Sequence, residues 1–142
     1  MIRIVLALCV FLNILGCATN SIQRDKTKII LDYYGLYNSS PEEQFIKLKS
    51  TNIIPRSLNS KFGIFVYSNT VDPIEIVFKM YAKKYNEIDE KLMLTTNASI
   101  SNKIGYNQLI RYTEEKDFEY EYWLFRVLYK NEVFVQQIFR QE

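Results

Sequence analysis

The sequence predicts a single all-β domain that follows a short export segment. Apolar residues make up 48% and aromatic residues 15% of the 142 residues, enough apolar surface to offset the chain entropy that keeps disordered segments unfolded. They fall into short runs rich in β-branched and aromatic side chains, and several runs alternate with polar residues as half-buried strands do. We therefore expect one β-rich domain over residues 29–142.

The first predicted strand covers residues 29–37, where Gly35 indicates a bulge or a close backbone approach. Residues 45–54 alternate loosely, so Ile46 and Leu48 are expected on the buried side of a second strand. The residues on its other side are Lys47 and Lys49. Three further strand candidates cover residues 62–67, 92–100 and 104–112.

The C-terminal stretch predicts a β-hairpin that closes the domain. Residues 118–129 and 133–139 are two strand candidates, and Lys130-Asn131 between them is a turn signal. One side of the first candidate carries the apolar residues Trp123, Phe125, Val127 and Tyr129. Trp123 is therefore expected in the core.

Residues 73–92 fit two structures. Alternation of Ile74, Ile76, Phe78 and Met80 with other residues is typical of a strand. An apolar stripe at helical spacing, with Asp72 as N-cap and Pro73 as the first helical residue, is typical of a helix. Local signals alone slightly favour the helix, which would make the fold α+β, an antiparallel sheet with one helix.

The order of several short motifs resembles an uncharacterised family of small exported bacterial domains, which are similar to immunoglobulin-type β-sandwiches. The motifs are Asp32-Tyr33-Tyr34-Gly35-Leu36-Tyr37, Ile54-Pro55, Phe62-Gly63 and Trp123-x-Phe125-x-Val127-x-Tyr129, with Phe139 near the end. The resemblance implies an immunoglobulin-like antiparallel β-sandwich with an aromatic pair packed inward. It tips residues 73–92 toward a strand and implies no activity.

The first residues have the pattern of an export signal. Arg3 supplies a positive charge, residues 4–15 are apolar except for Asn13, and a small residue follows. Such a run is shorter than the roughly 20 residues that a transmembrane helix needs. Ile14-Leu15-Gly16-Cys17 resembles the lipobox of bacterial lipoproteins. The resemblance implies that residues 1–16 are a cleaved signal peptide and that Cys17 is the lipidated first residue of the mature chain.

Two or more acyl chains together give a lasting membrane anchor. Residues 17–28 are mostly polar, which is typical of a flexible tether. Ala18, where lipoproteins retained at the inner membrane tend to carry Asp, resembles the pattern directed to the outer membrane. We expect a lipid-anchored protein of the cell envelope, at the periplasmic face of the outer membrane rather than the inner membrane.

Composition excludes several chemistries. The chain has no histidine, and once Cys9 leaves with the signal and Cys17 is acylated it has no thiol, so Ser-His-Asp and Cys-His catalysis are excluded. Four glycines provide no phosphate-binding loop. A net charge of +2 gives no electrostatic basis for binding nucleic acid. We expect no cofactor and no metal.

Three sets of residues could still bind or react. An acidic cluster, in which carboxylates could hold a cation or cleave a glycan, is more simply a solvated face; it comprises Glu114, Glu115, Asp117, Glu119 and Glu121. Aromatic rings that could stack on a ligand are more simply core; they are Tyr33, Tyr34, Tyr120, Tyr122 and Trp123. Scattered lysines that could face lipid are more simply solubilising; they are Lys47, Lys49, Lys61, Lys83 and Lys84.

Two functional classes remain from the sequence. The favoured one is a non-enzymatic binding or accessory module that contacts an envelope protein or glycan, a class that includes inhibitors of envelope enzymes. The alternative is a small glycan-processing enzyme that uses carboxylates. A concave acidic site with a raised carboxyl pKa would favour the enzyme.

Overall fold

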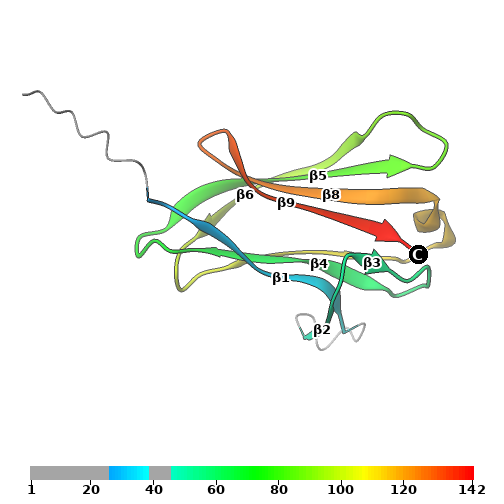
Figure 1. Ribbon diagram of the computed structural model, residues 1–142, viewed down its shortest axis with the longest axis horizontal. Helices are drawn as coiled ribbons and strands as arrows, with labels where there is room; N and C mark the ends of the chain where they lie inside the picture. Colours follow the sequence, from blue (N-terminus) through cyan, green and yellow to red (C-terminus); the bar gives the residue numbers. More distant parts are fainter. Residues whose placement is uncertain (1–25, 39–45) are drawn as a thin grey trace, which may run out of the picture.

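The structure is a β-sandwich of two sheets (Figure 1). It is a computed structural model that describes residues 26–38 and 46–142; the predicted signal peptide, Cys17 and most of the predicted tether lie outside these residues. The described strands are β1 (Ile29–Tyr37), β2 (Lys47–Ser50), β3 (Ile53–Ile54), β4 (Lys61–Ser68), β5 (Ile74–Lys84), β6 (Lys91–Ile100), β7 (Tyr106–Arg111), β8 (Tyr120–Tyr129) and β9 (Glu132–Gln141). A 3-10 helix, η1 (Glu115–Glu119), precedes β8. No helix among the described residues is long and apolar enough to cross a membrane.

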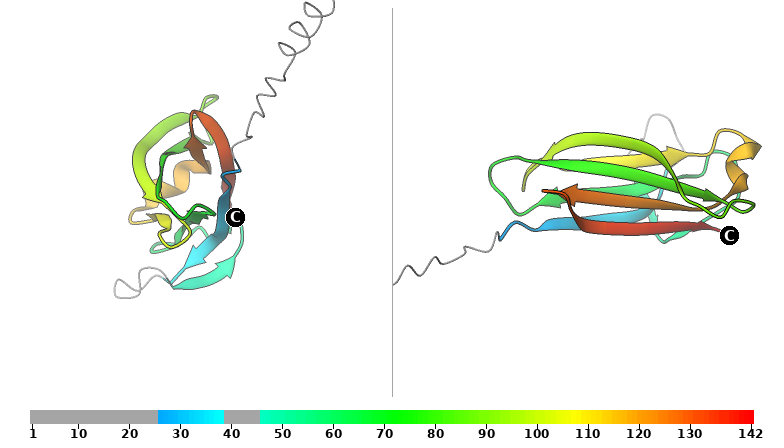
Figure 2. Two further views of the ribbon diagram at one scale, coloured as in Figure 1. Left: turned by 90° about the vertical axis from the view of Figure 1, so that its left-hand side faces the viewer. Right: turned by 90° about the horizontal axis from the view of Figure 1, so that it is seen from above.

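One sheet has the strand order β2-β1-β4-β7 and the other has the order β3-β9-β8-β5-β6. All neighbouring strands are antiparallel except the short β3, which runs parallel to β9. The two layers pack face to face along the length of the molecule (Figure 2). The predicted all-β antiparallel sandwich is confirmed.

Aromatic rings from both sheets fill the space between the layers. Phe62 of β4 contacts Phe125 of β8 and Phe139 of β9, with ring centroids 6.4 Å and 5.2 Å apart. All three side chains are fully buried, and Trp123 beside them is 6% exposed. Aromatic pairs of this kind are each worth about 0.5–1.5 kcal/mol beyond their buried area. The prediction that Trp123 belongs to the core is confirmed.

The helical alternative for residues 73–92 is wrong. Residues 74–84 form β5, which lies between β6 and β8 and pairs with both. Ile76 and Phe78 point into the core, as the alternating pattern predicts. The helix-capping signals around Pro73 are overridden because a central strand forms backbone hydrogen bonds with a neighbouring strand on each side and buries the side chains of one face.

The predicted strand over residues 45–54 is divided. β2 ends at Ser50 and β3 begins at Ile53, in the opposite sheet. Ile46 and Leu48 were expected to be buried, but they are 50% and 68% exposed. The expectation fails because β2 is a short edge strand that pairs with β1 alone, so the second sheet does not cover it.

Gly35 confirms the predicted close approach. Its φ of +145° is rarely adopted by residues with a side chain, and an added Cβ would lie 2.1 Å from the carbonyl oxygen of Lys49 on β2. Register shifts flank it on both sides, between Leu31 and Tyr33 and between Leu36 and Tyr37. Glycine therefore allows β1 and β2 to approach where the edge of the sheet bends.

Candidate functional site

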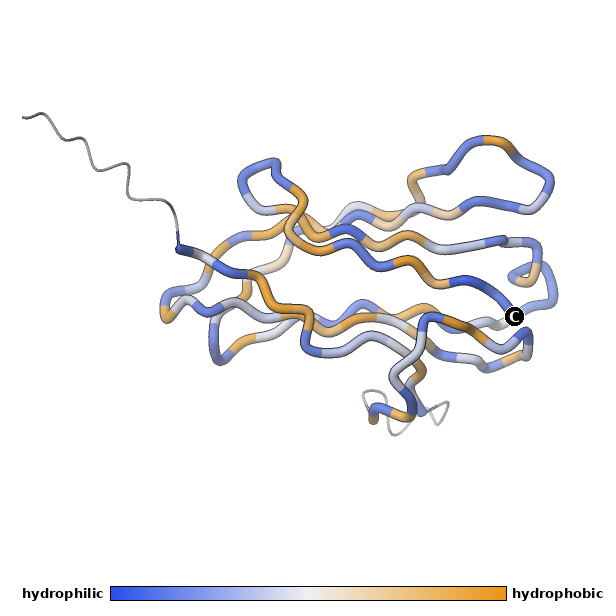
Figure 3. The backbone as a smooth tube through the Cα atoms, viewed as in Figure 1, coloured by the Kyte–Doolittle hydropathy of each residue, from blue (hydrophilic) through white to orange (hydrophobic). Residues whose placement is uncertain are grey.

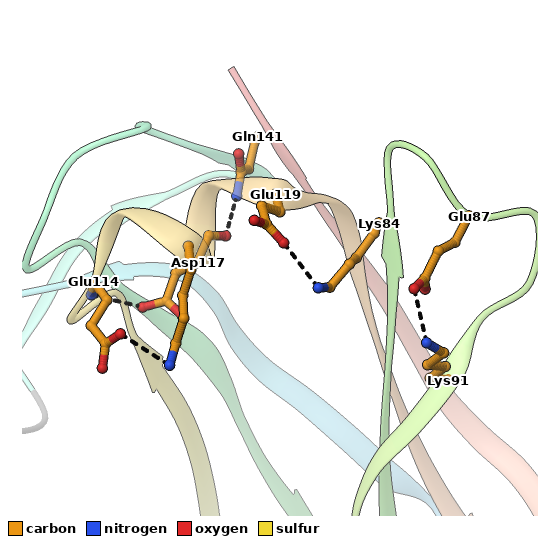
Figure 4. A network of polar contacts seen from close by, with 8 residues as sticks. Lys84, Glu87, Lys91, Glu114, Asp117, Glu119 and Gln141 are labelled. Atoms are coloured by element: carbon orange, nitrogen blue, oxygen red, sulfur yellow. Dashed lines mark hydrogen bonds and ion pairs between the residues drawn. The ribbon is translucent and has the colours of Figure 1, made fainter.

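The acidic cluster lies where η1 leads into β8, at the end of the sandwich that also holds the C-terminus (Figures 1 and 4). Asp117 accepts hydrogen bonds from the backbone N–H groups of Thr113 and Glu114, at 2.8 and 3.1 Å. Glu119 pairs with Lys84 at 2.9 Å, and Glu114 pairs with Lys116 at 3.0 Å. These carboxylates therefore cap the short helix or form surface ion pairs.

One residue of the acidic cluster, Glu119, borders a hollow of about 310 Å³, whose other acidic residue is Glu87. A hydrogen bond from Lys91 lowers the pKa of Glu87, whereas a general acid requires a raised pKa. Within residues 26–38 and 46–142, no cluster of acidic residues has the arrangement of a metal site.

The aromatic candidates do not form one platform. Tyr33 and Tyr34 belong to β1 in the four-stranded sheet, whereas Tyr120, Tyr122 and Trp123 belong to β8 in the other. Tyr120 packs on buried Trp123 with ring centroids 4.5 Å apart. Among these β8 residues, Tyr122 faces outward. Trp123, the next residue along the strand, faces inward with its register partner Ala82, and successive residues of a strand point to opposite faces of the sheet.

The lysines are dispersed in the same way. Lys61 is only 7% exposed, Lys47 pairs with Asp32 at 2.9 Å, and Lys49 lies on the exposed β2. Lys83 pairs with Glu121, which also lies 4.0 Å from Arg140. The predicted lysines therefore do not come together into one basic patch.

A different surface combines charge, aromatic rings and apolar side chains. It is the outer face of the five-stranded sheet, which we call the striped face because cross-strand neighbours form rows of alternating character. Its apolar row runs from β6 to β9 through Leu92, Tyr81, Leu124 and Ile138, of which Leu124 is covered by its neighbours and only 2% exposed. The adjacent polar row consists of Thr95, Lys79, Arg126 and Gln136. A second partly apolar row, beyond the polar one, includes Val77, Leu128 and Val133.

The polar row places two cations directly opposite each other. Lys79 of β5 and Arg126 of β8 are register partners in the centre of the sheet. Like charges opposite each other destabilise a sheet, and the described residues offer neither side chain a carboxylate within ion-pair distance. The Arg126 guanidinium instead donates to Gln136 at 2.9 Å and lies 5.3 Å from the Tyr81 ring.

The next row along the strands is built around Tyr122. Its hydroxyl donates to the Glu90 carboxylate at 2.6 Å, and this hydrogen bond raises the pKa of Tyr122 to about 12. The cationic groups of Lys83 and Arg140 lie 5.9 and 5.3 Å from the centre of its ring. The acidic and basic groups in this row are matched, whereas the row of Lys79 and Arg126 contains no acid of its own.

Sequence reasoning missed the striped face. Lys79 and Arg126 belong to strands far apart in the sequence, and only the register of β5 with β8 places them opposite each other. A usable signal was the strand alternative for residues 73–92, because it places Lys79 on the side opposite Phe78.

Comparison with solved structures shows a related fold. The chain is similar to an immunoglobulin-like protein from Pseudomonas aeruginosa, with a TM-score of 0.54 and 16% sequence identity over 81% of this chain and 97% of that one. At this identity the similarity shows an immunoglobulin-like fold alone. No protein-family model and no curated protein matches the chain.

Proposed function

We propose that the protein is a lipid-anchored, non-enzymatic binding module of the bacterial envelope, held through Cys17 and presenting its striped face to an acidic protein partner. The lipobox-like sequence, the polar tether that follows and Ala18 support the anchor and the outer-membrane location. The absence of histidine and of a thiol in the mature chain, together with carboxylates occupied in caps and ion pairs, supports a role in binding. An accessory subunit or inhibitor of an envelope enzyme would fit this class.

The observation that carries the proposed surface is the opposed pair of Lys79 and Arg126. An unmatched pair of cations in the centre of a sheet costs stability in the isolated domain, and a carboxylate from a partner would relieve that cost. The apolar rows on either side favour a protein partner over a glycan, because protein surfaces supply apolar side chains next to acidic ones.

The test is to reverse one charge of the pair. Lys79→Glu would place an acid opposite Arg126, so we expect it to stabilise the domain by about 0.2–1 kcal/mol, a rise in Tm of roughly 1–5 °C. The same variant should weaken partner binding. Lys103→Glu is the matched control, because it makes the same change in net charge at an exposed turn away from the face.

Binding is measured by photo-crosslinking in the native envelope with a reactive amino acid at Val133, which is exposed on the striped face and lies away from the β6 edge. We expect a discrete, protease-sensitive adduct that Lys79→Glu reduces at least tenfold and Lys103→Glu leaves intact. A protease-resistant adduct would identify a glycan and contradict the protein partner. An adduct of equal yield in both variants would contradict the role of the cation pair.

A further inference from the structure

The sandwich has four edge strands, and three of them carry features that block pairing with another chain. β3 has two residues, and β2 has four, of which two are the lysines 47 and 49. β7 has six residues and ends in the exposed Arg111. Short length and edge charges are the usual protection against edge-to-edge association.

β6 is the exception. It has ten residues, and after Lys91 at its start it contains no charged residue and no proline. Its one irregularity, opposite Met80 and Tyr81, lies near its beginning, so residues 94–100 stay in regular register with β5. The outer side of β6 is the edge of the five-stranded sheet, where its remaining backbone groups have no strand partner among the described residues.

Exposed apolar side chains lie at both ends of this edge. Leu92 and Met93 are 53% and 43% exposed, and Ile88, in the preceding hairpin, is 93% exposed. Figure 3 shows a hydrophobic segment within this otherwise mainly hydrophilic hairpin. Ile104, in the turn that follows β6, is 51% exposed. Ile88 and Ile104 are equally far along the chain from Thr96, near the middle of β6.

We infer that β6 is the docking edge for a second copy of this chain, paired antiparallel about a twofold axis at Thr96. Such pairing would join the two five-stranded sheets into one continuous sheet. It would bring Ile88 of each copy toward Ile104 of the other, and it opposes no like charges, because residues 92–100 are all uncharged. Each copy uses its β6 edge once, so the assembly closes as a dimer.

The dimer also determines how two anchored copies lie on a membrane, a consequence that depends on the proposed anchor. β1 begins at one end of the sandwich, where Ile29 pairs with Ser68 and Ser68 hydrogen-bonds to Ser101 just after β6 (Figure 1). Antiparallel β6 strands therefore place the two tethers at opposite ends of the pair. The long axes then lie along the membrane, and both striped faces point the same way.

The register is tested by cysteine crosslinking of the full, membrane-anchored chain. Thr95 and Asn97 are both exposed, and an axis at Thr96 places Thr95 of one copy opposite Asn97 of the other. Differently tagged Thr95→Cys and Asn97→Cys chains are co-expressed and oxidised, which gives a low background because the acylated Cys17 cannot form a disulfide. We expect mixed disulfide dimers in at least tenfold excess over those from Leu109→Cys and Arg111→Cys, which lie on the outward side of the β7 edge.

Asn97→Lys on the wild-type chain adds a protective charge to β6 and should shift the detergent-solubilised protein from dimer to monomer in analytical ultracentrifugation. Asn52→Lys is the control, because it makes the same substitution at an exposed position between β2 and β3, away from β6, and it should leave the dimer intact. Crosslinking no greater than that of the β7 pair, or a monomeric wild-type chain at high concentration, would overturn the inference. Cys17→Ser should lower crosslinking only at low protein concentration, because the anchor acts by raising the local concentration of the chain. Failure of the anchor is therefore distinguishable from failure of the β6 contact.

Discussion

At the scale of single residues, Tyr122 shows how a contact distant in sequence sets a titration. Its hydroxyl donates to Glu90 in the β5–β6 hairpin, and the negative carboxylate disfavours the phenolate. The folded protein therefore holds the proton to about pH 12, whereas an unfolded tyrosine loses it near pH 10. The sequence identified Tyr122 as a candidate ligand-stacking ring but could not identify Glu90 as its partner.

This difference predicts a loss of stability at high pH. The raised pKa contributes its full stability below pH 10, and the contribution declines as pH rises from about 10 to about 12, because the unfolded state then binds fewer protons than the folded state. Tyr122→Phe should flatten this decline in the free energy of unfolding, measured by urea denaturation at a series of pH values. Glu90→Gln keeps the phenol and should lower its pKa in absorbance titration at 295 nm. An unchanged pKa in that variant would contradict the assigned cause.

At the scale of elements, the turn between β8 and β9 is a local signal that the structure bears out. Tyr129 and Glu132 are register partners, and Lys130 and Asn131 between them have φ values of 50° and 64°. Positive φ at both central positions is the geometry of a type I′ turn, which Asn-Gly fits best. Lysine is strained in this conformation because its Cβ approaches the neighbouring carbonyl oxygen.

The double variant K130N/N131G should therefore stabilise the hairpin. We expect a gain of about 1 kcal/mol in the free energy of unfolding, because the strained left-handed residue is replaced by residues that tolerate positive φ. Asn102→Gly in the β6–β7 turn is the control, since Asn102 does not have a positive φ and extra backbone freedom there should not stabilise. A gain of the same size in both variants would contradict the argument from turn geometry.

The same scale separates what the sequence predicts from what it cannot. The closing hairpin and the strand over residues 29–37 are predicted because period-two alternation and turn residues are local properties. The burial of Ile46 and Leu48 is predicted wrongly because it depends on whether a second sheet covers β2. The striped face requires the register of β5 with β8, which no local pattern contains.

At the scale of the whole molecule, the described chain begins at one end of the sandwich, whereas the proposed binding surface lies along its length. β1 begins at one end, the C-terminus and η1 lie at the other, and the striped face runs between them (Figures 1 and 2). A tether over residues 17–28, at roughly 3.3 Å per extended residue, is long enough to let the domain lie along the membrane or stand away from it. Lipid attachment therefore need not obstruct the striped face.

The proposed anchor depends on one sulfur atom. Cys17→Ser removes the only site that the lipobox-like sequence offers for acylation, so we expect loss of fatty-acid label and release of the protein from washed membranes. Cys9→Ser is the matched control, because Cys9 leaves with the predicted signal peptide and should change neither readout. Mass spectrometry of the wild-type membrane-bound chain should find Cys17 as a diacylated or triacylated N-terminal residue. An uncleaved leader or an unmodified Cys17 thiol would contradict the anchor while leaving the sandwich and its β6 edge in place.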